Sequence, residues 1–172
     1  MRVDGILLTS ERENILKKDI ATLLEELRTG VLKPVEVLEA YQAKSLVVDR
    51  DINAVCDYIL EARDWALDLE NTPVDERRAL YGLPISVKVY LIDARMGHVS
   101  YQECFYVAGY DSTIGLAQHI GRPQPADCSF VSGVKELHAL PFCLTNIPQT
   151  MLSWSCSNPV YGNTANPHDK TR

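Results

Sequence analysis

The sequence predicts an α/β protein with a mostly parallel or mixed sheet flanked by helices. Two apolar runs, LYGLPISVK at 80–88 and LPFCLTN at 140–146, are typical of buried strands. Segments with helical spacing precede each run, and this alternation is typical of strands joined by helical connections. Residues 1–12 are expected to form a leader, and residues 13–172 to form the N-terminal portion of a single domain.

Two helices are expected in the first third of the chain. Asp19 is predicted to cap the first helix, whose apolar residues recur at i, i+3, i+4 and i+7 from Ile20. Gly30 is predicted to end it, because glycine adopts the left-handed conformation that ends many helices. Pro34 suits the first turn of the second helix, where no backbone N–H is needed.

The rest of the chain continues the same alternation. AVCDYIL at 54–60 is expected to form a strand, and ARDWALDLE at 62–70 a helix. Asp127 is predicted to cap a further helix before the apolar run LPFCLTN. From Pro148 onward, frequent Asn, Pro and Gly indicate loops and turns.

Composition and charge exclude several classes of function. The net charge is −6 with no basic stripe, which argues against nucleic-acid binding and against electrostatic attachment to a membrane. The five cysteines form no C-x-x-C pair, so neither a zinc site nor a disulfide framework is expected. We see no secretory signal and no apolar run of 18 residues, so an intracellular, reducing location is expected.

Lys88, at the end of the first apolar run, is the first candidate for chemistry. A lysine that loses solvation at the end of a buried strand favours its neutral amine, which can act as a base. The alternative is a strand-end lysine whose ammonium group reaches water, and spacing alone favours this alternative.

Other polar residues carry weaker signals. Ser153, Ser155 and Ser157 lie in LSWSCSN, which lacks the G-x-S-x-G pattern of a nucleophile elbow, and loop serines that bond their own backbone are the stronger interpretation. Thr145-Asn146 follows a strand and is interpreted first as a turn stabilised by the Asn side chain. The histidines show no metal-ligand spacing.

The motifs nevertheless occur in an order that resembles one family. LYGLPISVK is followed by ECF at 103–105, GYDSTIGL at 109–116 and TNIPQTMLSWSCSNP at 145–159. This order resembles the amidase-signature family, and within it the hydrolases of fatty acid amides. The resemblance covers nearly the whole chain apart from residues 1–12 and 89–102, and it implies the N-terminal part of the amidase-signature fold.

The resemblance implies a Ser–Ser–Lys triad in place of a Ser–His–Asp triad. Lys88 is implied as the base, which takes a proton through a bridging serine from a nucleophilic serine. That serine attacks an amide carbonyl to give an acyl-enzyme. Met151 and Ser153 match family positions near the active site and are implied to line it. The family needs no metal and no cofactor.

The first departure from the family pattern concerns the two serines. In the family they lie in Gly- and Ser-rich segments, which also supply backbone donors for the oxyanion. The 172 residues contain no Gly-Gly and no Ser-Ser pair. We therefore expect an N-terminal fragment that is inactive alone. The alternative is a non-catalytic isoform that binds lipid or a full-length partner.

The second departure is an insertion beside Lys88. The family has glutamate directly after the lysine, whereas here residues 89–102 separate Lys88 from Glu103. The insertion begins with Val (codon GTN) and ends with Gln (codon CAG), and its 14 codons are 14 × 3 = 42 nucleotides. These ends match the limits of an intron, so we expect a translated intron. The alternative is a genuine surface-loop insertion.

For the parent hydrolase the resemblance implies fatty acid amide substrates of the N-acylethanolamine type, cleaved to a fatty acid and an amine. It further implies that the parent forms homodimers and lies in the cytoplasm or peripherally at an internal membrane.

Overall fold

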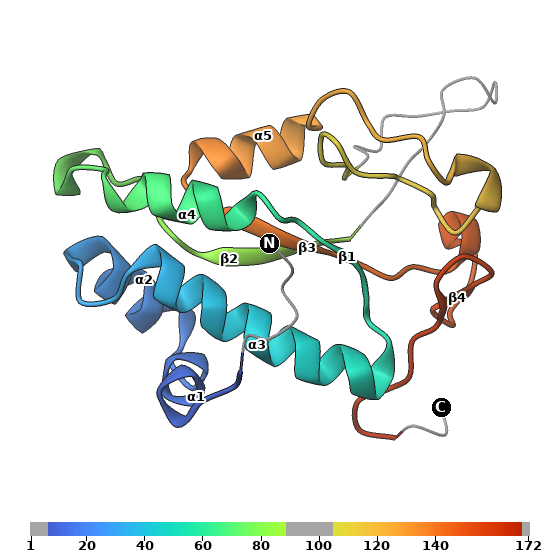
Figure 1. Cartoon of the computed structure of the whole chain (residues 1–172), viewed down its shortest axis with the longest axis horizontal. Helices are drawn as coiled ribbons and strands as arrows, with labels where there is room; N and C mark the ends of the chain where they lie inside the picture. The colour runs from blue at the N-terminus through green and yellow to red at the C-terminus, as the bar shows by residue number, and fades with distance from the viewer. Residues whose placement is uncertain (1–6, 89–104, 170–172) are drawn as a thin grey trace.

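The computed structural model of the chain describes residues 7–88 and 105–169. Its centre is a three-stranded sheet in the order β1–β3–β2. Strand β1 (Val55–Tyr58) runs antiparallel to β3 (Leu140–Thr145), and β2 (Pro84–Lys88) runs parallel to β3. Figure 1 shows this sheet between two layers, with helices α4 and α5 on one side and α2 and α3 on the other. The predicted α/β class with a mixed sheet is confirmed.

The elements around the sheet are short, apart from α3. The helices are α1 (Ser10–Leu16), α2 (Ile20–Thr29), α3 (Pro34–Ile52), α4 (Ala62–Glu70) and α5 (Ser129–Glu136). Single 3₁₀ turns lie at η1 (Val74–Glu76), η3 (Ala117–His119) and η4 (Gln149–Met151), and a hairpin of β4 (Ser157–Asn158) and β5 (Gly162–Asn163) follows.

Capping explains where α2 and α3 begin and end. The carboxylate of Asp19 accepts a hydrogen bond from the backbone N–H of Thr22, which otherwise has no partner in the first turn. Gly30 ends α2 with φ 82°, a conformation that costs a residue with a Cβ atom about 1–2 kcal/mol. Pro34 is the first residue of α3. All three predictions are confirmed.

The prediction that Asp127 caps a helix is wrong. The residue that caps α5 is Cys128, whose Sγ accepts from the N–H of Val131, and not Asp127. The Asp127 carboxylate instead accepts from the N–H of Ala108 and pairs with Lys135 at 2.7 Å. Helix α1 begins at Ser10, within residues 1–12.

Strand β3 lies at the centre of the hydrophobic core. Its first five residues are buried, as expected for a strand covered on both faces. Leu38 of α3, Ala66 of α4 and Val131 of α5 belong to the core cluster that surrounds it. Burying one large aliphatic side chain of this kind contributes about 1.5–3 kcal/mol. The covered sheet is therefore a stable base for the residues at its end.

Within residues 7–88 and 105–169, no helix combines the length and apolar character that a membrane span requires. The insertion predicted at 89–102, and Glu103 after it, fall outside the described residues.

Candidate functional site

Lys88 is the last residue of β2, at the carboxyl end of the parallel strand pair. Its pairing partner in the register is Thr145, the last residue of β3. Ligands of α/β proteins bind outside the carboxyl ends of parallel strands. The Lys88 side chain is exposed in this structure, so the expected desolvation of a buried strand end is wrong for the described residues. The alternative of a strand-end lysine that reaches water fits better.

Met151 and Ser153 lie on the loop that leaves β3 at the same end of the sheet. Met151 is half-buried at the end of η4 and has a positive φ of 59°. Ser153 is exposed, and its hydroxyl accepts from the N–H of Ser155 and lies 3.0 Å from the Ser155 hydroxyl. These bonds match the interpretation of loop serines that bond their own backbone.

A pair of buried asparagines, Asn146 and Asn158, fixes the start and end of this loop. The Asn158 side chain donates to the Asn146 Oδ1 at 2.7 Å and to the Ile147 carbonyl at 2.8 Å. Its own Oδ1 accepts from the N–H groups of Val160 and Tyr161. The predicted turn at Thr145-Asn146 is wrong, because Thr145 is the last residue of β3 and no turn follows at Asn146. The expected side-chain bond is present, since the Asn146 Oδ1 accepts from the N–H of Ile147. The role of Asn158 was not foreseen from the sequence.

The β4–β5 hairpin is also tied to the end of α3. Asn53, which ends α3 in the left-handed conformation, donates its side-chain amide to the carbonyls of Tyr161 and Asn163. Thr164 donates its hydroxyl to the Asn53 carbonyl and accepts from Asn146. These long-range bonds hold the hairpin beside the end of the sheet.

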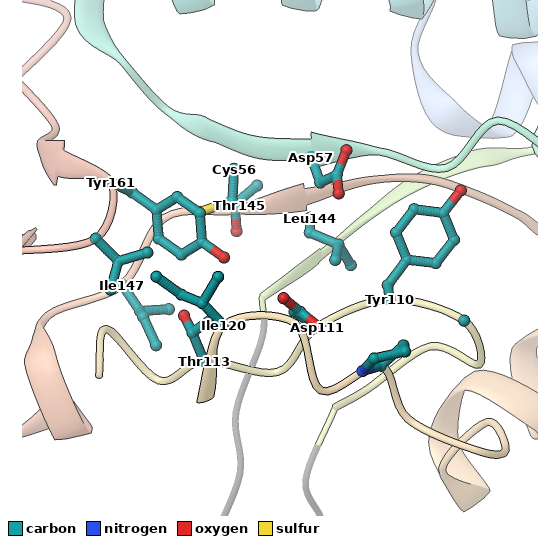
Figure 2. A pocket seen from close by; sticks show the side chains of 13 residues that line it. Cys56, Asp57, Tyr110, Asp111, Thr113, Ile120, Leu144, Thr145, Ile147 and Tyr161 are labelled. Atoms are coloured by element: carbon teal, nitrogen blue, oxygen red, sulfur yellow. The ribbon is translucent and has the colours of Figure 1, made fainter. Parts of the chain in front are cut away.

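A cavity of about 460 Å³ opens between the sheet, the 107–123 segment and the hairpin. Figure 2 shows side chains that reach it from β1, from β3 and from the two loops. Thr145, the pairing partner of Lys88, lies in its wall, so the cavity adjoins the end of the sheet where Lys88 lies. The lining residues are Cys56, Asp57, Gly109, Tyr110, Asp111, Thr113, Ile120, Pro123, Leu144, Thr145, Ile147, Val160 and Tyr161.

The cavity walls disfavour additional negative charge. Burial raises the pKa of the Cys56 thiol to about 12, and the nearby Cys156 and Asp49 act in the same direction, so Cys56 is a neutral thiol and not a nucleophile. Partial burial also raises the pKa of Asp57, and the negative charges of Asp111 and Glu61 raise it further. The hydrogen bond from the Tyr58 N–H acts in the opposite direction and lowers this pKa. The pKa of Tyr161 is raised by burial too, although its hydrogen bond with Thr113 opposes the rise.

The cavity was not foreseen from the sequence because its walls come from distant segments. Asp57 and Asp111 are 54 positions apart in the chain, and neither lies in a motif with metal-ligand spacing. The one local signal was GYDSTIGL, which supplies Gly109, Tyr110, Asp111 and Thr113 to the wall. The match of GYDSTIGL to a family motif gave the position of this segment in the chain. It did not show which other segments lie against it in the cavity wall.

The sequence matches one protein family, described as Amidase, over residues 36–172. Among curated proteins it is 36% identical over 167 residues to fatty acid amide hydrolase 1 of Caenorhabditis elegans, an alignment that covers 95% of this chain and 27% of that protein. It is also 36% identical over 164 residues to vitamin D3 hydroxylase-associated protein of Gallus gallus, covering 94% of this chain and 32% of that protein.

A solved structure of a fatty acid amide hydrolase resembles this one with a TM-score of 0.81 at 19% sequence identity. The likeness extends over 99% of this chain and 31% of that one, and at this identity it concerns the fold alone. The chain thus spans between a quarter and a third of the length of these relatives.

Proposed function

Because the chain belongs to the amidase family, we propose that it is the N-terminal portion of a serine hydrolase that cleaves fatty acid amides. The products are a fatty acid and an amine, and N-acylethanolamines are the substrate class we expect. The proposal for fatty acid amides is supported by the 36% identity to the Caenorhabditis elegans protein named fatty acid amide hydrolase 1.

The observation that carries the proposal is the position of Lys88. It ends β2 directly beside Thr145 of β3, at the carboxyl end of the parallel pair, and the loop with Met151 and Ser153 leaves β3 there. In this proposal Lys88 is the base, and Met151 and Ser153 line the substrate site. Residues 13–172 form one part of a single hydrolase domain, preceded by the leader.

In the proposed mechanism, the neutral Lys88 amine accepts a proton that passes through a bridging serine from a nucleophilic serine. The serine oxygen attacks the amide carbonyl, the protonated amine leaves, and water hydrolyses the acyl-enzyme. Lys88 is exposed in the described structure.

Both serines of the proposed triad belong to Gly- and Ser-rich segments that the 172 residues do not contain. We therefore expect the purified 172-residue chain to release no fatty acid from a long-chain N-acylethanolamine. Turnover that disappears in a Lys88→Ala variant would contradict this expectation.

The transcript tests the hydrolase itself. Amplification of the messenger RNA across codons 80–120 and beyond codon 172 should join Lys88 directly to Glu103 and continue into a Gly- and Ser-rich segment. The protein translated from that transcript should hydrolyse the amide, and Lys88→Ala should abolish turnover. Lys88→Ala in the 172-residue chain should change the unfolding free energy by less than about 0.5 kcal/mol, because the side chain is exposed.

A second candidate function is a non-catalytic isoform that binds lipid or a full-length hydrolase. Its support is the row of exposed apolar side chains after β3, where Leu152 is 89% and Trp154 is fully exposed. A messenger RNA that retains the 42 nucleotides, together with co-purification of the chain and the full-length hydrolase, would favour it. The first proposal, the parent hydrolase, includes three further properties. The parent forms homodimers, lies in the cytoplasm or peripherally at an internal membrane, and needs no cofactor.

A further inference from the structure

The cavity beside β1 holds negative charge without a basic partner. Among the described residues that line it, Asp57 and Asp111 are charged, and no Lys, Arg or His is present. Figure 2 shows that their carboxyl groups come from two different walls, Asp57 from β1 and Asp111 from the 107–123 segment. A partly enclosed space with two carboxylates focuses a negative potential.

Among the described residues, each carboxylate is only partly used by the fold, and Asp57 is an exposed residue of β1. Asp57 accepts one hydrogen bond through Oδ1, from the N–H of Tyr58 at 2.9 Å. Asp111 accepts one through Oδ2, from the N–H of Gly121 at 2.6 Å. A carboxylate offers about four acceptor positions on its two oxygens, so both side chains retain capacity for a donor placed in the cavity.

The rest of the wall suits an organic cation more than a metal ion. Tyr110 and Tyr161 contribute aromatic rings to the wall, a group that attracts cations, and Ile120 adds apolar surface. A divalent metal needs six or more oxygen ligands or a compact set of His, Cys and carboxylates. Over residues 7–88 and 105–169, no such set of three His, Cys, Asp or Glu side chains occurs.

We propose that this cavity binds a small primary ammonium ion, with its charge between the carboxylates of Asp57 and Asp111 and its carbon stem against Tyr161 and Ile120. A volume of about 460 Å³ accommodates such an ion with several waters. The binding does not depend on the proposed hydrolysis. If the chain is part of an amide hydrolase, the released amine is a cation of this class.

Titration of the ¹⁵N-labelled 172-residue chain with ethylammonium chloride tests the proposal. The N–H groups of Tyr58 and Gly121 donate to the two carboxylates, so their amide signals report on charge placed between them. We expect both signals to shift and saturate at millimolar concentrations, as is typical of a single small charged contact. Ethanol has the same size without the charge and should leave both signals in place.

Two substitutions separate this site from general attraction to an acidic protein. Asp57→Asn keeps the shape and the bond from Tyr58, and it should weaken ethylammonium binding at least ten-fold. Asp64→Asn removes the same charge from the exposed first turn of α4, outside the cavity wall, and should leave the affinity within two-fold. Asp111→Asn is the second cavity variant. If Asp57→Asn does not fold, the same loss of ethylammonium binding is measured in Asp111→Asn.

Four outcomes would overturn the proposal. The first two are amide shifts of the same size with sodium chloride at equal ionic strength, and amide shifts of the same size with ethanol. The third is an equal affinity for ethylammonium in the cavity variants and in Asp64→Asn. The fourth is displacement of ethylammonium by magnesium chloride at lower concentration. The last outcome would identify the cavity as a divalent-metal site. None of these measurements requires turnover, so failure of the proposed hydrolase leaves the test unaffected.

Discussion

The side-chain amide of Asn158 donates to the side-chain oxygen of Asn146 at 2.7 Å, and both residues are less than 10% exposed. One bond thus joins the end of the central strand β3 to the hairpin strand β4. Both asparagines lie beside the loop that carries Met151 and Ser153, so the geometry of that loop depends on this contact.

Asn158→Ala should destabilise the chain by about 2–3 kcal/mol, because it leaves the buried Oδ1 of Asn146 and the N–H groups of Val160 and Tyr161 without these partners. Denaturant unfolding measures the change. Asn163→Ala in the exposed strand β5 is the control and should cost less than about 0.5 kcal/mol. Equal effects of the two substitutions would show that the buried bond contributes nothing.

Gly115→Ala should destabilise the chain by about 2–4 kcal/mol. A Cβ atom at Gly115, where φ is +72°, would lie 2.6 Å from the Asn158 Cβ, so it adds overpacking to the cost of the left-handed conformation. Gly109→Ala is the matched control, because φ there is +81° and no atom lies within 4 Å of the added Cβ. It should cost only about 1–2 kcal/mol. Urea unfolding of both variants tests the difference, and equal losses would contradict the predicted contact.

The stability of the chain should fall as the pH is lowered below 6.5, in part because of His138. Burial and the charge of Arg78 lower the pKa of His138 in the folded state below the 6.5 of the free side chain. The neutral ring also accepts from the N–H of Arg78 through Nδ1. The unfolded chain therefore binds this proton more readily, and the contribution is present above pH 6.5 and lost as the pH falls through the folded-state pKa.

Thermal unfolding from pH 8 to pH 5 measures this dependence. In His138→Asn the slope over this range should be smaller, since asparagine does not titrate and tolerates the positive φ of 67° at this position. An unchanged slope in the variant would assign the pH dependence to other groups.

Asp57→Asn should stabilise the chain at neutral pH. The folded-state pKa of Asp57 is raised above 3.8 by partial burial and by the charges of Asp111 and Glu61, so the ionised side chain opposes folding. This penalty grows as the pH rises through the folded-state pKa and is absent below 3.8. Melting temperatures should thus favour the variant at pH 7 and converge with the original chain near pH 3.5. A variant that is less stable at pH 7 would show that the carboxylate contributes a contact beyond its bond from Tyr58.

Local signals in the sequence predicted the helices and strands better than the site. Asp19, Gly30 and Pro34 act on the turn in which they stand, so the limits of α2 and the start of α3 follow from a few neighbouring residues. Asp127 shows the limit of such reasoning. Its carboxylate bonds the N–H of Ala108 and the ammonium group of Lys135, and Cys128 caps α5 in its place.

The candidate site depends on contacts that no local pattern encodes. The exposure of Lys88 depends on what covers the edge of the sheet, and the asparagine pair joins residues 12 positions apart around a loop. The cavity brings together four segments of the chain. The family resemblance supplied the order of the motifs, whereas the distances between them required the folded structure.

The chain contains two tryptophans, and they differ in environment. The Lys135 Nζ lies over the ring of Trp65, 3.8 Å from the centre of that ring, whereas Trp154 on the loop after β3 is fully exposed. The Trp154 indole should therefore emit at long wavelength and be quenched readily by iodide, and covering it should shift its emission to the blue. In a Trp65→Phe background the chain thus carries a built-in fluorescent reporter for any lipid or polypeptide that binds over that loop.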